Sequence, residues 1–129
     1  MRKIERYYLK ALNWAKRTYD IGRYHVGAII VQKSINKIVS TGRNLYLQKG
    51  PKYTYHAEEI AVLKRMPERM VGGTIFVASY RFTKHGERKP LYSRPCRRCI
   101  SLLYKIGLKR MVYRDQKGIL VGEKIPNPE

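Results

Sequence analysis

The sequence contains few acidic residues, few cysteines and few aromatic residues other than tyrosine. Nine Asp and Glu stand against 28 Lys and Arg, so the chain of 129 residues has a formal net charge of +19. This imbalance is extreme for so short a chain and indicates a polyanionic partner. A basic but merely solvated surface is the alternative, because charge alone carries no specificity.

Long hydrophobic runs are also missing. No window approaches the roughly 18 consecutive apolar residues of a membrane-spanning helix, and the longest candidate, residues 26–31, is a short strand-like run. The first residues, Met-Arg-Lys-Ile-Glu-Arg, contain no apolar signal segment. The sequence therefore predicts a protein without a membrane segment, located inside the cell in the cytoplasm or nucleus.

The length is that of one ordinary domain. A chain of 129 residues with 43% hydrophobic residues can bury a single core, and it is too short for two. We expect this domain to cover residues 1–125. The remaining residues, 126–129, read Pro-Asn-Pro-Glu and are expected to form a loose tail.

The only two cysteines, Cys96 and Cys99, are separated by two residues. In an intracellular chain this spacing is typical of a metal or redox site rather than a structural disulfide. A thioredoxin-like redox pair is the rival interpretation. Pro95 before the pair, and His56 and Glu58 earlier in the chain, favour a metal site.

Apolar periodicity predicts three helices and five strands. The expected helices cover residues 3–19, 57–65 and 95–106. The expected strands cover residues 26–32, 37–41, 73–80, 109–113 and 119–124. Short turns join the first two strands and the last two, so each pair should be antiparallel. Residues 81–94 lack apolar periodicity and are expected to form a long surface excursion.

The third expected helix carries both cysteines. Pro95 fits its first turn, where the missing N–H has no cost. The buried stripe of this helix is expected to consist of Cys99, Leu102, Leu103 and Ile106. Cysteines three apart at a helix start share a face. The helix dipole, together with Arg97 and Arg98, should favour their thiolate form.

His56, Cys96 and Cys99 form a three-ligand set that suits catalytic zinc. Catalytic zinc sites use three protein ligands and leave one position for water, whereas structural sites use four. Water activated by zinc can attack an amidine-like ring carbon, and Glu58 is placed to move the protons. Residues two apart on a regular helix point in opposite directions, so this motif should lie at a helix entrance.

A closed structural zinc site is the alternative interpretation. His25 or His85 could supply a fourth ligand and make a zinc knuckle that only joins the two helices. His25 precedes an apolar strand, however, and is more typical of a packed or surface histidine. Glu59, next to Glu58, is expected to be a solvated or capping helix residue rather than a second catalytic acid.

His-x-Glu followed by Pro-Cys-x-x-Cys is the signature of zinc-dependent nucleobase deaminases. The chain resembles the cytidine deaminase superfamily, which includes cytidine, deoxycytidylate, tRNA adenosine and APOBEC-type deaminases. The resemblance implies an α/β fold: a single cytidine deaminase-like domain with a five-stranded mixed sheet, about three flanking helices and an antiparallel C-terminal hairpin. It also implies Zn²⁺, hydrolysis of a cyclic amidine C–N bond and a possible homo-oligomer.

The resemblance assigns roles to particular residues. His56, Cys96 and Cys99 would bind zinc, and Glu58 would be the proton shuttle. The substrate-binding residues it implies are Asn44, the backbone amide of Ala57, Tyr46 and Val26.

Departures from the family pattern bear on the substrate. Free cytidine deaminases usually have Cys where this chain has His56, and a ribose-binding Glu where it has Tyr46, which counts against a free nucleoside. The Glu usually found just before Pro-Cys in tRNA adenosine deaminases is replaced by Arg94, which counts against adenine.

Basic residues concentrate beside the cysteines. Residues 81–98 contain seven Lys and Arg against one acid, Glu87, and tyrosines lie in the same loops. A basic groove with aromatics suits a nucleic acid strand. The expected nucleic-acid-binding residues are Arg81, Lys84, Arg88, Lys89, Arg94, Arg97 and Arg98.

Three functions remain open from the sequence. The first is conversion of cytosine to uracil in single-stranded DNA or RNA. The second is a free cytidine or deoxycytidylate deaminase of pyrimidine salvage, with a pyrimidine nucleotide as its partner. The third, from another class, is a noncatalytic nucleic-acid-binding module held together by zinc.

Overall fold

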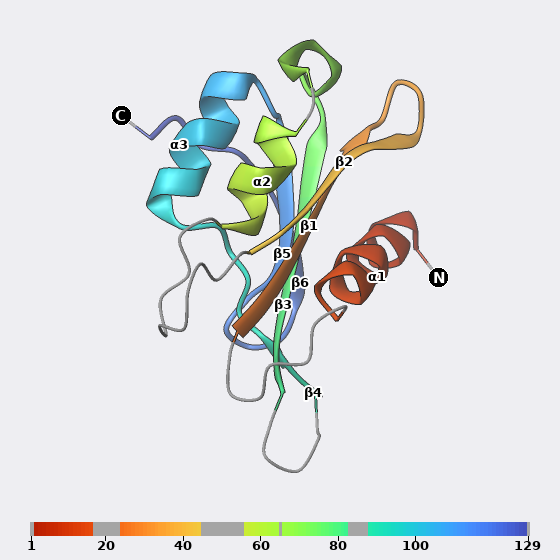
Figure 1. The fold of residues 1–129 in the computed structure, drawn as a ribbon, viewed down its shortest axis with the longest axis vertical. Helices are drawn as coiled ribbons and strands as arrows, with labels where there is room; N and C mark the ends of the chain where they lie inside the picture. The colour runs from red at the N-terminus through yellow and green to blue at the C-terminus, as the bar shows by residue number, and fades with distance from the viewer. Residues whose placement is uncertain (1, 17–23, 45–55, 65, 83–87, 129) are drawn as a thin grey trace.

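A mixed sheet with helices on both faces forms the described part of the chain (Figure 1). The computed structural model describes residues 2–16, 24–44, 56–64, 66–82 and 88–128, with only the backbone at 24, 81–82 and 88–91. Over these residues, no helix combines the length and the apolar character that crossing a bilayer requires. The α/β class expected from the sequence is confirmed.

The strands follow the order β2-β1-β3-β5-β6, and β4 pairs with β3 outside this path. Their bounds are β1 Tyr24–Gln32, β2 Lys37–Arg43, β3 Thr74–Phe82, β4 Arg88–Leu91, β5 Arg110–Arg114 and β6 Leu120–Lys124. Neighbouring strands are antiparallel except β3 and β5, which are parallel. The five predicted strands and both antiparallel pairs are therefore confirmed.

The sixth strand, β4, corrects the prediction of an irregular excursion over residues 81–94. β3 continues to Phe82, and β4 pairs antiparallel with it, from Ser79 opposite Leu91 to Phe82 opposite Arg88. Strand pairing uses backbone groups, so a charged sequence can pair without an apolar pattern. Pro90 lies in β4, which is consistent with a strand that pairs with β3 alone among the described strands.

Helix α1 covers one face of the sheet, and α2 and α3 cover the other (Figure 1). The helix bounds are α1 Lys3–Ala15, α2 Ala57–Leu63 and α3 Arg97–Ile106, with a 3₁₀ turn at Pro67–Arg69. β3 alternates between the two cores, because Phe76 packs in the α1 cluster and Val77 in the α2–α3 cluster. The sheet is thus buried on both sides.

The helix ends differ from the predicted ones. α1 stops at Ala15, four residues earlier than predicted, and residues 17–19 lie outside the described part. α2 stops at Leu63 rather than at 65. In α3 the N-cap is Cys96, so Pro95 precedes the helix instead of lying in its first turn. Periodicity locates a helix face well but its ends poorly, because caps depend on local backbone geometry.

The buried stripe of α3 is also shifted. Its buried residues are Cys99, Ile100 and Leu103, whereas Leu102 and Ile106 are only partly buried. Gly107 ends the helix in the left-handed conformation, with φ of 95°, which glycine adopts readily.

Two glycines allow helices to lie directly on the sheet. A Cβ at Gly42 in β2 would overlap the carbonyl oxygen of Ala57 in α2. A Cβ at Gly27 in β1 would overlap the carbonyl oxygen of Ala11 in α1. The first contact holds the start of α2 against the end of β2, and this is where the candidate site lies.

Candidate active site

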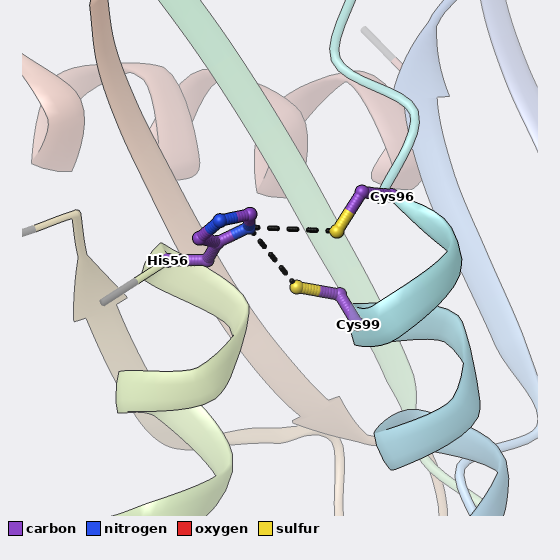
Figure 2. A group of neighbouring side chains, drawn as sticks. All are labelled: His56, Cys96 and Cys99. Carbon is purple, nitrogen blue, oxygen red and sulfur yellow. Dashed lines mark hydrogen bonds between the residues drawn. The ribbon is translucent and has the colours of Figure 1, made fainter. Parts of the chain in front are cut away.

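Three metal-binding side chains meet between the starts of α2 and α3 (Figure 2). His56 is the N-cap of α2, Cys96 is the N-cap of α3, and Cys99 lies in the first turn of α3. The His56 Nδ1 atom lies 3.5 Å from Cys96 Sγ and 3.4 Å from Cys99 Sγ. His56 and the two cysteines, some forty positions apart in the sequence, are thus brought together because the starts of α2 and α3 lie side by side.

These distances fit a zinc ion. Zn–S bonds of about 2.3 Å and Zn–N bonds of about 2.0 Å, at a tetrahedral angle, place N and S about 3.5 Å apart. The ligand atoms of the three residues all lie within 4.8 Å of one another. Two thiolates and a neutral imidazole would also balance the charge of the ion.

Within the described residues, no fourth His, Cys, Asp or Glu joins this group. His25 is buried in β1 and stacks on Tyr80, with ring centroids 5.1 Å apart, so it is the packed histidine that its position predicted. His85 lies outside the described residues. The described donor set is therefore that of an open catalytic site rather than a closed knuckle.

The protonation of the ligands partly contradicts the sequence-based expectation. Burial, together with the nearby Arg98, lowers the pKa of His56, which keeps its imidazole neutral as a metal requires. Burial, and then the adjacent Glu58, raises the pKa of the Cys99 thiol. The expected thiolate is therefore not favoured at Cys99 before metal binds, because burial outweighs the helix dipole, and metal binding must release its proton.

Glu58 is buried beside the three ligands, with 5% of its surface exposed. Burial raises the pKa of Glu58 to about 7, although hydrogen bonds from its own backbone N–H and from the Cys99 side chain act in the opposite direction. His56 has the extended backbone of an N-cap, so its side chain and that of Glu58 line the same cavity. The predicted location at the helix entrance is confirmed.

Glu59 has a different task. One of its carboxylate oxygens accepts the backbone N–H of His56 at 2.9 Å and a hydrogen bond from Arg98 at 2.8 Å. The predicted capping role is confirmed. The carboxylate of Glu59 therefore links the start of α2 to α3 and holds His56 in place.

A cavity of about 180 Å³ opens beside the ligands. Val26, Asn44 and Ala57, which were all predicted to bind substrate, line it. The Val26 N–H donates to the Asn44 side-chain oxygen at 2.9 Å, and the Asn44 N–H donates to the Val26 carbonyl at 3.2 Å. This pairing fixes the orientation of the Asn44 amide at the end of β2.

Five further residues line the cavity, and of these the sequence analysis assigned only Arg94, as a nucleic-acid-binding residue. They are Val77 and Ser79 from β3 and Tyr92, Ser93 and Arg94 from the segment before α3. Ser93 Oγ donates to the Val77 carbonyl at 2.7 Å and accepts the Arg114 N–H at 3.0 Å. The one available signal was Ser79, a polar residue in an apolar strand, whose Oγ donates to the Tyr92 carbonyl at 3.2 Å.

The predicted nucleic-acid-binding residues fall into three groups. Arg94 donates to Glu123 at 2.8 Å, and Arg98 to Glu59 at 2.8 Å, so both engage carboxylates of the chain. Arg97 is exposed beside the site. The described structure does not reach the remaining predicted site residues, which are Tyr46, Lys84 and the side chains of Arg81, Arg88 and Lys89.

The chain is similar to known proteins in its sequence and in its fold. Residues 1–115 match the family model of the cytidine and deoxycytidylate deaminase zinc-binding region. No protein of curated function matches the chain.

Among solved structures, the chain is similar in fold to the dCMP deaminase of the cyanophage S-TIM5. The apo form has 22% identity and a TM-score of 0.57, over 90% of this chain and 86% of that chain. The same enzyme in complex with dCMP and dUMP has 21% identity and a TM-score of 0.56, over 90% and 85%. The cytidine deaminase of Mycobacterium leprae has 18% identity and a TM-score of 0.58, over 95% and 94%.

Proposed function

The chain belongs to the cytidine and deoxycytidylate deaminase family, and from this we propose that it converts cytosine to uracil in single-stranded DNA or RNA. Membership makes it a zinc-dependent hydrolase that acts on the C–N bond of a cyclic amidine. A polymeric substrate is favoured because the cavity at the metal centre has the size of a base and the chain has a net charge of +19.

His56, Cys96 and Cys99 would hold the zinc ion through Nδ1 and the two Sγ atoms. When bound there, zinc lowers the pKa of water and so supplies a nucleophile near neutral pH. Glu58 is proposed to take a proton from the water, deliver it to the ring nitrogen N3, and pass the next one to the departing ammonia. Its raised pKa suits both taking and giving a proton at neutral pH.

The other cavity residues are proposed to orient the base. Asn44 and the backbone N–H of Ala57 would hydrogen-bond the nucleotide, with the carbonyl oxygen of the base on Ala57. Val26 and Val77 supply apolar surface for the faces of a flat ring. Such walls favour one orientation of the ring, with its amino-bearing carbon toward the metal.

The size of the cavity favours a nucleotide that is held mainly outside it. Pockets for drug-sized ligands are about 300–1,000 Å³, whereas this one has about 180 Å³ and suits a single base. Sugar and phosphates would then lie at the rim, where the lining residue Tyr92 is 49% exposed. Arg97, which follows the ligand Cys96 in the sequence, is also exposed. Exposed aromatic and cationic side chains are the groups that bind single strands.

A free nucleotide is the second candidate, because one similar structure is a dCMP deaminase in complex with dCMP and dUMP. The test is a side-by-side assay of ammonia release from cytidine, dCMP, single-stranded DNA, RNA and adenine-containing controls. We expect cytosine-containing oligonucleotides to give the highest kcat/KM. Turnover of dCMP or cytidine with none of any oligonucleotide would reject the polymer and support the second candidate.

A further inference from the structure

Five basic side chains gather on the α1 face of the sheet, opposite the metal centre. A cavity of about 400 Å³ lies between α1 and strands β1, β3 and β5, and Lys3, Lys33 and Arg110 line it. A second cavity of about 120 Å³ adjoins it, shares Lys3, and adds Arg6 and Lys10. The two cavities together are called the α1 groove here.

No carboxylate balances these charges. Among the described residues, neither cavity is lined by Asp or Glu, and none of the five cations forms an ion pair. Arg94 and Arg98 near the metal centre behave differently, because each is paired with a carboxylate of the chain. Like charges placed together without counter-charges repel one another, so an external anion would relieve the repulsion.

The floor of the α1 groove is apolar and aromatic. It is lined by Tyr7, which is partly exposed, and by Val31, Phe76 and Val112, each with 3% or less of its surface exposed. The rings of Tyr7 and Phe76 have centroids 5.3 Å apart, and the Tyr7 hydroxyl donates to Asn36 at 3.1 Å, which holds the tyrosine in place. Bare anions gain nothing from such a floor, whereas a ligand that carries both phosphates and flat rings does.

The basic surface continues from the α1 groove onto β6, the strand at this end of the sheet order. Gly122 and Lys124 of β6 are exposed. The Arg110 side chain of β5 lies over Gly122, because a Cβ added at Gly122 would be 3.3 Å from the Arg110 guanidinium. The paired register places Arg110 opposite Lys124, which extends the basic surface to the sheet edge.

We propose that the α1 groove binds a single-stranded nucleic acid, as a second contact surface separate from the catalytic cavity. Five cations spread over two adjoining cavities exceed what the phosphates of one mononucleotide need. An apolar floor favours a single strand, whose bases are exposed, over a duplex, whose bases are stacked inside. This inference goes beyond the proposed function, since binding here requires no target cytosine.

The test uses a fluorescent oligonucleotide without cytosine, dT30 or rU30, and zinc-loaded protein. The groove variant is K3Q/R110Q. The matched control is R69Q/K105Q, which removes the same charges from exposed positions of the 3₁₀ turn and α3, on the other face of the sheet. Binding is measured by fluorescence anisotropy between 50 and 400 mM KCl.

Each phosphate contact to a single strand contributes about 0.7 to the slope of log K against log[salt]. Loss of two contacts should therefore make the salt dependence less steep by about 1.4 and weaken binding about 25-fold at 0.1 M salt. The control should change binding less than about threefold, and dCMP turnover should be unchanged in both variants.

Equal losses in both variants would show that only net charge matters and would overturn the inference. Binding to anionic lipid vesicles but to neither oligonucleotide would overturn it too. Specific loss of binding in a protein that deaminates only dCMP would support the groove and reject the polymer substrate. If the protein deaminates oligonucleotides and the groove variant binds them normally, the polymer substrate is supported and binding in the α1 groove is rejected.

Discussion

At the residue scale, two adjacent carboxylates have separate tasks because their surroundings differ. Glu58 is buried beside Cys99, and its pKa is raised to about 7. Glu59 faces Arg98 and the His56 N–H, and it caps α2. Substitutions at the two positions should therefore separate chemistry from positioning.

Glu58→Gln keeps the size of the side chain but removes the group that carries protons. We expect a loss of ammonia release of about 10²–10⁴-fold, the usual contribution of general acid–base catalysis. Bound zinc, measured by atomic emission, should be retained. Glu59→Gln is the matched control: an amide oxygen can still accept the His56 N–H, so most of the activity should remain. A Glu58→Gln enzyme with wild-type turnover would disprove the assigned role.

The raised pKa of Glu58 also predicts how stability depends on pH without metal. In the folded chain Glu58 holds its proton up to about pH 7, whereas the ordinary value is 4.5. Between these values the unfolded chain has released a proton that the folded chain keeps, so stability falls as pH rises from 4.5 to 7. The loss for this one group is about 3 kcal/mol.

Urea unfolding of chelator-treated protein at several pH values tests this prediction. Relative to wild type, Glu58→Gln should remove the decline over that window, because its amide does not titrate. Glu59→Gln should leave the decline in place. Parallel curves for wild type and Glu58→Gln would mean that Glu58 titrates normally.

At the element scale, the site depends on where two short helices begin. The starts of α2 and α3 supply all three described metal ligands. α2 has only seven residues and is too short to be stable alone, so its position comes from packing on the sheet. Gly42 is part of that packing, because a Cβ there would overlap the Ala57 carbonyl oxygen.

Gly42→Ala should displace α2 and weaken zinc binding. The new methyl group overlaps the Ala57 carbonyl, and overpacking of this kind costs about 1–3 kcal/mol. Gly27→Ala is the matched control, because it overlaps the Ala11 carbonyl of α1 and should cost a similar amount. Competition with a chromophoric chelator should show weaker zinc binding for Gly42→Ala alone. Equal zinc affinity in both variants would show that the start of α2 can shift without disturbing His56.

At the scale of the whole molecule, the net charge of +19 governs encounters with substrate. If the substrate is a polymer, several phosphates are bound at once, and each releases counterions. A mononucleotide brings only one phosphate group. Salt should therefore affect the two substrates differently.

For a cytosine-containing 20-mer, three phosphate contacts would make log(kcat/KM) fall with log[KCl] at a slope of about −2. Between 50 and 200 mM KCl this is a loss of about 16-fold. The slope for dCMP should be shallower than about −1, which serves as the internal control. Equal slopes for both substrates would indicate that the site recognises only one nucleotide.

The amino-acid sequence was sufficient to predict the residue types of the metal centre, the acid next to it, five strands and the approximate positions of three helices. These features follow from local patterns, such as ligand spacing, apolar periodicity and the glycine after α3, which need only neighbours along the chain. The helix entrance at His56 was also predictable, because residues two apart cannot otherwise point the same way.

The residues that line the cavity, and the pairing of the charged side chains near it, became evident only from the folded structure. Ser79 and Tyr92 reach the cavity through the pairing of β3 with β4, and Arg94 meets Glu123 across 29 residues of sequence. The α1 groove likewise joins residues from α1, β3 and β5. Such contacts depend on strand register and on how layers pack, and neither leaves a periodic signal in the local sequence.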